Sequence, residues 1–282
     1  MLSGQLSFAI NDSFVKLAVK KINSDTSIFS VIFVRMIITS TLIGFYIKFI
    51  EKKKLSKIFF YKNYHMRGFY EIMTALFFFA GLILLPIAEV YTLLMTNPFF
   101  VTIFAYFFLK EKVGIRRWSA VIIGFIGVIF VINPQNILSF NFLFLLPIIA
   151  AIFLTIRDIA TKSFATKNNN FEIIFITSLL MTVFSGVGTF IFGFEVSFNE
   201  ANYILISSIF VLFGYLFSVM TVFYAPLSLT ASSRYSVIIF GIILGFLILG
   251  EIPSYNMIIG AIIITLSGLF VIKREKDIGK IN

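Results

Sequence analysis

Six charged side chains within apolar stretches are the residues of this sequence whose types and spacing could do chemistry. Asp12 precedes Lys16 by four residues, and Arg35 stands in the next apolar stretch. The other three are Arg157, Asp158 and Arg234. A charge at the centre of a membrane helix costs about 2.5–3.5 kcal/mol, so such residues usually face a cavity or a partner. The excess of cations favours a substrate with a carboxylate or a phosphate, which a guanidinium grips by a bidentate fork, or a zwitterion.

The same residues could instead form structural ion pairs that lock helices together. Asp12 and Lys16 lie one helical turn apart and could neutralise each other. Arg157 and Asp158 are adjacent in the sequence and would point about 100° apart, so we do not expect both to serve one small site directly. The two remaining arginines have no obvious acid in their own helices and need partners from elsewhere.

Depth along the expected helices divides the six residues into two sets, one in each half of the membrane. The set nearer the outer face comprises Asp12, Lys16 and Arg35, and the set nearer the inner face comprises Arg157, Asp158 and Arg234. Such an arrangement suits a substrate path with outer and inner contacts. The aspartate of either set could also carry protons, and the sequence leaves the coupling ion open.

Three further polar residues are candidates for substrate binding. Tyr91 and Tyr235 carry hydroxyl groups that need polar partners when buried, and Tyr235 directly follows Arg234. Asn97 precedes Pro98 inside an apolar span, where a proline removes a backbone hydrogen bond. Broken helices are places where carriers often bind substrate, although a simple kink would leave the same pattern.

Four glutamates near the ends of apolar spans are expected to be structural. Glu89 is placed to cap the start of a helix and to favour its positive dipole end. We expect Glu71 to be solvated near the cytoplasmic face. Glu111 and Glu251 are expected to bond neighbouring loop amides.

The composition indicates whether water or lipid surrounds the helices that carry these residues. Hydrophobic residues make up 59% of the chain and charged residues 13%, and the mean hydropathy is +1.01. A spanning helix needs about 20 mostly apolar residues. The sequence therefore predicts an all-α integral membrane protein of ten transmembrane helices, without room for a soluble domain. The expected spans are 4–21, 27–49, 68–87, 89–109, 116–133, 141–164, 172–193, 203–224, 227–249 and 256–272.

An internal repeat organises these spans. PIAEVYTLLMTNPFFVTIFAYFFLKE runs from Pro86 to Glu111, and PLSLTASSRYSVIIFGIILGFLILGE runs from Pro226 to Glu251. In each half, an aspartate near the start also precedes a lysine by four residues. Such duplication is typical of transporters built from repeats. We therefore expect two five-helix repeats, residues 1–134 and 141–273, followed by a cytoplasmic tail, residues 274–282.

The distribution of Lys and Arg predicts the orientation. Basic residues gather in alternate loops, within 52–67, 110–117, 162–167 and 273–280, whereas the opposite loops hold Lys20 and Lys21. By the positive-inside rule both termini are then cytoplasmic. Because five is an odd number, the second repeat must be inverted relative to the first, which suits alternating access.

Features of one transporter family are spread over the whole chain. They are the two proline-to-glutamate spans, Asn11-Asp12 with Lys16, Arg35, the segment 110–118 followed by Gly124 and Gly127, Arg157-Asp158 and Arg234-Tyr235. With them the chain resembles a ten-helix member of the drug/metabolite transporter superfamily, EamA type. The finer features are most similar to bacterial carriers that take up riboflavin or S-adenosylmethionine. The resemblance implies a substrate cavity between the two repeats and a location in the bacterial inner membrane.

Several functions find no support in the sequence. The chain has no cysteine, and its one histidine, His65, lies in a basic loop, which excludes thiol chemistry and a Ser-His-Asp arrangement. We therefore expect no enzyme activity, no cofactor and no nucleic-acid partner, since orientation explains the basic residues. The partners expected are a small-molecule substrate and membrane lipids, for a chain acting as a monomer. Import of a small polar metabolite is favoured over export or flipping of metabolites, drugs or lipids, and over a membrane scaffold.

Overall fold

The computed structural model describes residues 2–107, 114–132, 141–164, 170–224 and 234–277, and every regular element in these ranges is a helix. The longer helices are α1 (Leu2–Ile22), α2 (Ser27–Phe45), α4 (Lys62–Leu84), α7 (Ile115–Ile132), α8 (Leu145–Phe164), α9 (Asn170–Phe192), α10 (Ala201–Tyr224) and α13 (Tyr255–Asp277). The shorter ones are η1 (Tyr46–Ile50), α3 (Leu55–Ile58), α5 (Ile87–Leu94), α6 (Asn97–Phe107), η3 (Phe142–Phe144), η5 (Phe198–Glu200), α12 (Ser236–Leu244) and η6 (Gly245–Leu249).

The chain is a multi-pass membrane protein by the length and apolarity of its helices. Within the described residues, six helical stretches are long and apolar enough to cross a membrane: Ser27–Ile50, Lys62–Leu84, Ile87–Phe104, Phe142–Thr161, Asn170–Phe192 and Phe198–Met220. Trp118–Ile132, Ser236–Leu249 and Tyr255–Phe270 are shorter apolar helices. A helix satisfies its backbone polar groups internally, as a bilayer requires. Large apolar side chains such as Phe190 are exposed, as expected of a surface that contacts lipid.

Two helices differ from their predicted limits in ways that affect the site. α4 begins at Lys62 rather than at residue 68, so its polar residues lie deeper in the helix than expected. The span predicted over 89–109 is divided into α5 and α6, with the break directly before Asn97-Pro98. The break arises because proline cannot donate the backbone hydrogen bond that would continue a helix. Some features that the sequence singled out lie outside the described residues. They are residues 110–113, Pro134, Pro226 and the end of the predicted tail.

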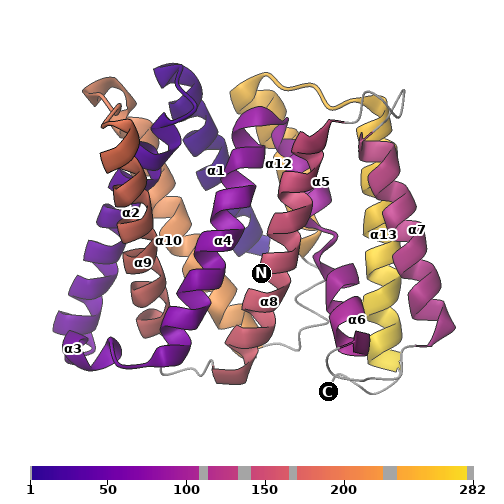
Figure 1. Cartoon of the computed structure of the whole chain (residues 1–282), viewed down its shortest axis with the longest axis horizontal. Coiled ribbons are helices and arrows are strands. Elements are labelled where there is room, and N and C mark those ends of the chain that lie inside the picture. The colour runs from indigo at the N-terminus through magenta and orange to yellow at the C-terminus, as the bar shows by residue number, and fades with distance from the viewer. Residues whose placement is uncertain (1, 108–113, 133–140, 165–169, 225–233, 278–282) are drawn as a thin grey trace.

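Helices from the two halves of the sequence pack against each other in pairs. α1 packs on α10, α2 on α9, α4 on α8, α5 on α12, and α7 on α13. Figure 1 shows the α7–α13 pair at one end of the molecule and the α2–α9 pair at the other. The helices nearest the middle, α1, α4, α5, α8 and α12, carry most of the charged residues singled out in the sequence.

The basic loop between α2 and α3 is tied to the second half of the chain by an ion pair. Lys53 Nζ lies 2.8 Å from Glu172 Oε1 and 3.0 Å from Glu51 Oε2. Partial burial opposes the charge of Lys53, but the two carboxylates outweigh burial and raise its pKa above the ordinary value. Lys53 therefore keeps its charge at neutral pH.

The α7–α13 pair makes a close backbone approach that depends on glycine. A Cβ atom added at Gly260 would lie 2.6 Å from the carbonyl oxygen of Gly127 and 2.9 Å from the backbone nitrogen of Val131. Both atoms belong to backbone, so neither can rotate away. Small residues at such contacts let membrane helices pack closely.

Replacing Gly260 by alanine should therefore loosen the α7–α13 pair. We expect a loss of about 1–3 kcal/mol, the usual cost of overpacking a close contact. The measurement is thermal unfolding of the detergent-solubilised protein. Gly114→Ala is the matched control, because nothing lies within 4 Å of a Cβ added there. Equal melting temperatures for both variants would contradict the close approach.

Candidate functional site

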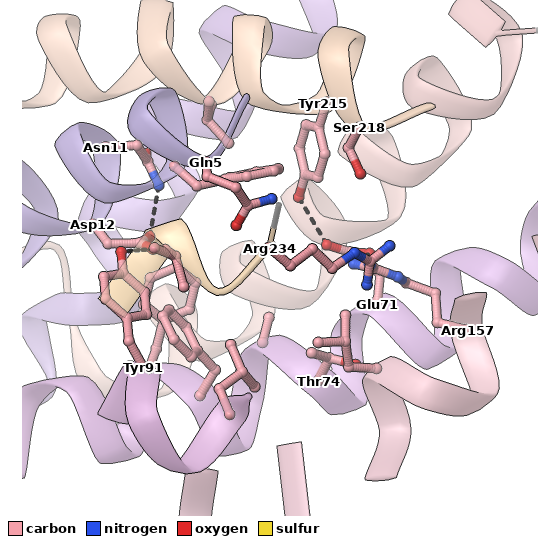
Figure 2. A pocket seen from close by; sticks show the side chains of 18 of the residues that line it. Gln5, Asn11, Asp12, Glu71, Thr74, Tyr91, Arg157, Tyr215, Ser218 and Arg234 are labelled. Carbon is pink, nitrogen blue, oxygen red and sulfur yellow. Dashed lines mark hydrogen bonds and ion pairs between the residues drawn. The ribbon is translucent and has the colours of Figure 1, made fainter. Parts of the chain in front are cut away.

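A cavity of about 130 Å³ lies between helices from both halves of the chain. α1, α2, α4 and α5 contribute to its wall from the first half, and α8, α9, α10 and α12 from the second. Its polar lining residues are Gln5, Asn11, Asp12, Arg35, Glu71, Thr74, Tyr91, Arg157, Tyr215, Ser218 and Arg234. Phe78 and Phe79 add aromatic surface. We call this space the central cavity; Figure 2 shows most of its polar side chains.

One polar cluster of the central cavity is built on α1. Asn11 Nδ2 donates to Asp12 Oδ1 at 2.7 Å, and the hydroxyl group of Tyr91 donates to Asp12 Oδ2 at 2.7 Å. Arg35 Nη1 donates to Asn11 Oδ1 at 2.7 Å. All four residues are buried. Asn11 thus bonds an arginine with its oxygen and a carboxylate with its nitrogen.

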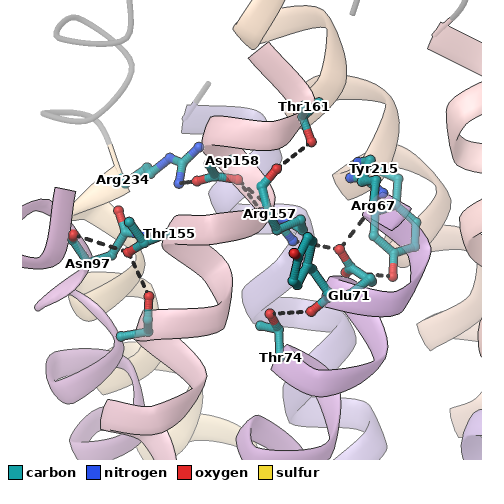
Figure 3. A network of polar contacts seen from close by, with 12 residues as sticks. Arg67, Glu71, Thr74, Asn97, Thr155, Arg157, Asp158, Thr161, Tyr215 and Arg234 are labelled. Atoms are coloured by element: carbon teal, nitrogen blue, oxygen red, sulfur yellow. Dashed lines mark hydrogen bonds and ion pairs between the residues drawn. The ribbon is translucent and has the colours of Figure 1, made fainter. Parts of the chain in front are cut away.

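A second polar cluster joins α4 to α8, α10 and the segment before α12, as Figure 3 shows. Arg157 Nη1 lies 2.7 Å from Glu71 Oε2, and Arg157 Nη2 lies 2.8 Å from Asp158 Oδ1. Arg234 pairs with the other oxygen of Asp158. The hydroxyl group of Tyr215 donates to Glu71 Oε1 at 3.1 Å. Each carboxylate of this cluster therefore contacts at least one guanidinium.

A third arginine, Arg67, supports this cluster from outside the cavity lining. Its Nη1 donates to Thr177 Oγ1 at 2.6 Å and lies 3.8 Å from Glu71 Oε2. Its side chain is buried, although the sequence placed it in a cytoplasmic loop. The earlier start of α4 explains the difference.

Lys16 lies at a separate contact, which we call the latch: Lys16, Leu85, Ile87 and Glu251. Lys16 Nζ lies 2.5 Å from both Glu251 Oε1 and the carbonyl oxygen of Leu85. The backbone nitrogen of Ile87 donates to Glu251 Oε2 at 2.7 Å. The latch joins α1 and the α4–α5 turn to the segment between η6 and α13. Lys16 and Glu251 also line a polar cavity of about 560 Å³, which we call the vestibule.

The structure brings five of the nine predicted substrate-binding residues to the central cavity. These are Asp12, Arg35, Tyr91, Arg157 and Arg234. Asp158 is absent from the lining and lies beside it, held by two arginines. Members of both sets, which were expected in separate halves of the membrane, thus line one cavity.

The other three predicted residues lie elsewhere. Lys16 belongs to the latch. Asn97 Nδ2 donates to Thr155 Oγ1 at 3.0 Å and so connects α6 to α8. Tyr235 packs with its hydroxyl group against Gly268 of α13, where a Cβ could not fit. That hydroxyl group is buried and has no hydrogen-bond partner among the described residues.

The geometry decides how two pairs of nearby charges are arranged. Asp12 and Lys16 do not neutralise each other, because Lys16 reaches Glu251 and Asp12 accepts bonds from neutral donors. Arg157 and Asp158 do meet although their Cβ atoms diverge, because the long arginine side chain folds back onto its neighbour. Angles between Cβ atoms do not limit a side chain as long as arginine.

Two glutamates differ from their expected roles. Glu71 was expected to be solvated, yet it is buried and bonded to Arg157 and Tyr215. Glu89 lies in the first turn of α5, but the first amide of that helix is capped by Glu251 from the other half of the chain. Glu251 thus bonds the first amide of α5, in the other half of the chain, rather than a neighbouring loop amide, and it also forms an ion pair.

The sequence interpretation missed Gln5, Glu71 and Thr74 as cavity residues. Glu71 carried a usable signal, since a carboxylate in an apolar helix is costly unless it has a partner. Gln5 lies near the start of α1, and its amide extends between the two clusters in the view of Figure 2. Thr74 carried no signal, because threonines also bond their own helix, as this one bonds the carbonyl oxygen of Tyr70.

Comparison with known proteins points to membrane transport rather than catalysis. Residues 1–133 match the EamA-like transporter family. The chain is 28% identical to an S-adenosylmethionine uptake transporter of Rickettsia prowazekii over 201 residues, covering 70% of this chain and 66% of that protein. It is 28% identical to a riboflavin transporter of Rhizobium johnstonii over 202 residues, covering 70% and 65%. The chain thus spans about two thirds of the length of these relatives.

More distant likenesses concern an exporter and the fold. The chain is 20% identical to a pseudopaline exporter of Pseudomonas aeruginosa over 219 residues, covering 75% of each protein. The fold of this chain is similar to that of a protein chain in a known crystal structure. The alignment covers 98% of each chain, with a TM-score of 0.62 and 15% sequence identity. The relatives therefore include carriers named for both directions of transport.

Proposed function

We propose that this chain, whose residues 1–133 match the EamA-like transporter family, is a secondary transporter of the drug/metabolite transporter superfamily. It moves a small polar or zwitterionic metabolite across the bacterial inner membrane by alternating access, in the direction of uptake. One observation carries the proposal. The central cavity is lined by charged side chains from both halves of the chain, in a protein whose helices are otherwise apolar. Charges inside a membrane protein mark substrate paths.

The pairing of the helices supports the proposed division into inverted repeats, 1–134 and 141–273. If α1, α2 and α4 correspond to α8, α9 and α10, a twofold rotation converts the α1–α10 pair into the α8–α4 pair. It also converts the α2–α9 pair and the α7–α13 pair into themselves. All of these pairs occur in the fold. Such symmetry provides two equivalent packings, one open to each side.

The distribution of basic residues supports the proposed orientation. The α2–α4 connection, which carries Lys52, Lys54 and Lys57, lies at the lower edge of Figure 1, as does the end of α13. The vestibule, with Glu251, belongs to the opposite edge. By the positive-inside rule the lower edge is cytoplasmic, and we propose that both termini, with residues 274–282, face the cytoplasm. One chain carries both repeats, so we expect a monomer.

The direction of transport has an alternative in the same fold. One relative is named an S-adenosylmethionine uptake transporter, a second a riboflavin transporter, and a third a pseudopaline exporter. Uptake is favoured because a carrier of hydrophobic drugs or lipids would not need buried charges around its cavity. The alternative is an exporter or flippase of metabolites, drugs or lipids.

An uptake assay in cells tests this proposal. Cells that express the chain should accumulate one compound of a labelled panel comprising S-adenosylmethionine, riboflavin, amino acids and nucleosides. Arg234→Ala should abolish that uptake at equal membrane abundance, because the side chain lines the central cavity. Arg116→Ala, at an exposed position of α7, is the matched control. No uptake of any compound, with faster loss of preloaded ones, would favour export instead.

A further inference from the structure

We propose that Arg35 forms an anion subsite in the central cavity, and that the substrate is a zwitterion whose anionic group binds Arg35 and whose cationic group binds Asp12. This inference rests on the proposed transport function and specifies its substrate class. The first observation is the incomplete bonding of Arg35. Its side chain is 1% exposed, and its Nε is buried without a hydrogen-bond partner among the described residues.

The bonds that Arg35 does make leave one edge of its guanidinium available. Nη1 donates to Asn11 Oδ1, and the guanidinium carbon lies 5.2 Å from the centre of the Phe79 ring. Neither partner is a carboxylate. The edge formed by Nε and Nη2 is the fork that binds a carboxylate or a phosphate through two parallel hydrogen bonds. A buried arginine without such a partner is costly, and a bound anion would offset that cost.

The other arginines of the central cavity differ from Arg35 in this respect. Arg157 pairs with Glu71 and Asp158, and Arg234 pairs with Asp158. Their charges are already compensated by protein carboxylates. Arg35 is therefore the cavity arginine, within the described part of the chain, that lacks an ion pair.

Asp12 shows the complementary deficiency. Its two oxygens accept hydrogen bonds from Asn11 and from Tyr91, which are neutral donors. No ion pair involves Asp12 in the ranges that the structure describes, and Lys16, one turn away on the same helix, is held by Glu251. Because Asn11 bonds both residues, the two opposite charges lie on either side of a single side chain, where they attract each other without forming a direct ion pair. A substrate with an anionic and a cationic group close together would compensate both.

Binding to purified protein in lipid nanodiscs tests the inference with two pairs of probes. S-adenosylmethionine and its decarboxylated form differ by a carboxylate, and riboflavin 5′-phosphate and riboflavin differ by a phosphate. These pairs distinguish the two sources of an anionic group. The variants are Arg35→Gln, which removes the charge, and Arg35→Lys, which keeps the charge without the fork. Arg67→Gln is the matched control, because Arg67 is also buried with an unpartnered Nε but lies outside the cavity lining.

We expect the wild type to bind the carboxylate probe about 10- to 100-fold more tightly than its decarboxylated form, since a hydrogen bond to a charged group contributes about 1.5–3 kcal/mol. Arg35→Gln should abolish that preference, Arg35→Lys should retain part of it, and Arg67→Gln should leave it intact. Asp12→Asn should weaken binding of both S-adenosylmethionine forms, which are cationic. A preference for the phosphate probe alone would overturn the zwitterion and retain the anion subsite.

Other outcomes separate this inference from the proposed function. Equal binding of both members of each pair by the wild type, together with uptake of any compound in cells, would overturn the subsite and leave transport standing. Equal loss of the preference in Arg35→Gln and Arg67→Gln, with unchanged melting temperatures, would also overturn it. Absence of binding and of transport in either direction would overturn the proposed function, and this inference with it.

Discussion

In the orientation and direction of transport that we propose, neutralising Lys16 should open the outer side of the protein and strongly reduce uptake. Lys16 holds Glu251 and the carbonyl oxygen of Leu85 at 2.5 Å each, between the vestibule and the helices that line the central cavity. Breaking a buried ion pair by removing one partner costs about 3–5 kcal/mol. The substitution destabilises the conformation seen here by that amount. The equilibrium between conformations should therefore shift toward a state open to the outside.

Cysteine labelling measures this shift directly, because the natural chain contains no cysteine. Val237→Cys places a reporter in the lining of the central cavity. We expect Lys16→Met to raise its labelling by an impermeant maleimide from outside at least tenfold, which corresponds to about 1.4 kcal/mol. Lys20→Met is the matched control, since Lys20 also lines the vestibule but is exposed.

A charge swap separates the ion pair from other effects of Lys16. Lys16→Glu should abolish uptake, because two carboxylates would then face each other in the latch. Lys16→Glu combined with Glu251→Lys should restore part of the uptake and slow the labelling again. If the double variant were as open as Lys16→Glu alone, the latch would not depend on this pair.

Replacing Asp158 by alanine should strongly destabilise the protein. Asp158 is buried and contacts both Arg157 and Arg234. Its removal leaves Arg234 without a carboxylate and Arg157 with Glu71 alone. We expect a loss of about 3–5 kcal/mol, the usual cost of an uncompensated buried charge. Thermal unfolding in detergent is the measurement.

Removing the partner charge as well should recover part of that stability. Asp158→Ala combined with Arg234→Met takes away one buried charge of each sign, so the double variant should unfold at a higher temperature than Asp158→Ala. The control is Asp25→Ala at an exposed position, where surface substitutions usually change stability by less than about 0.5 kcal/mol. If Asp158→Ala unfolded at the same temperature as Asp25→Ala, the stabilising role given to Asp158 would be wrong.

The sequence anticipated the class of protein and most of the helices because hydropathy is a local property. Each apolar run must form a helix in lipid whatever its neighbours are, and the break before Asn97-Pro98 follows from proline alone. The positions of α1, α2 and α9 agree with their predicted spans. The number of spans, the inverted repeat and the orientation remain predictions from the same reasoning.

The tertiary structure decided which charges meet, because packing brings together side chains that are distant in the sequence. Lys16 finds Glu251 across the two halves of the chain, and Glu71 is covered by Arg157 and Tyr215. No spacing rule within one helix could reveal these contacts, since they depend on which helix faces which. The sequence by itself thus determined a set of costly charges in a membrane protein. The fold decided that most of these charges compensate one another, and that Arg35 and Asp12 remain without ion pairs in the described part of the chain.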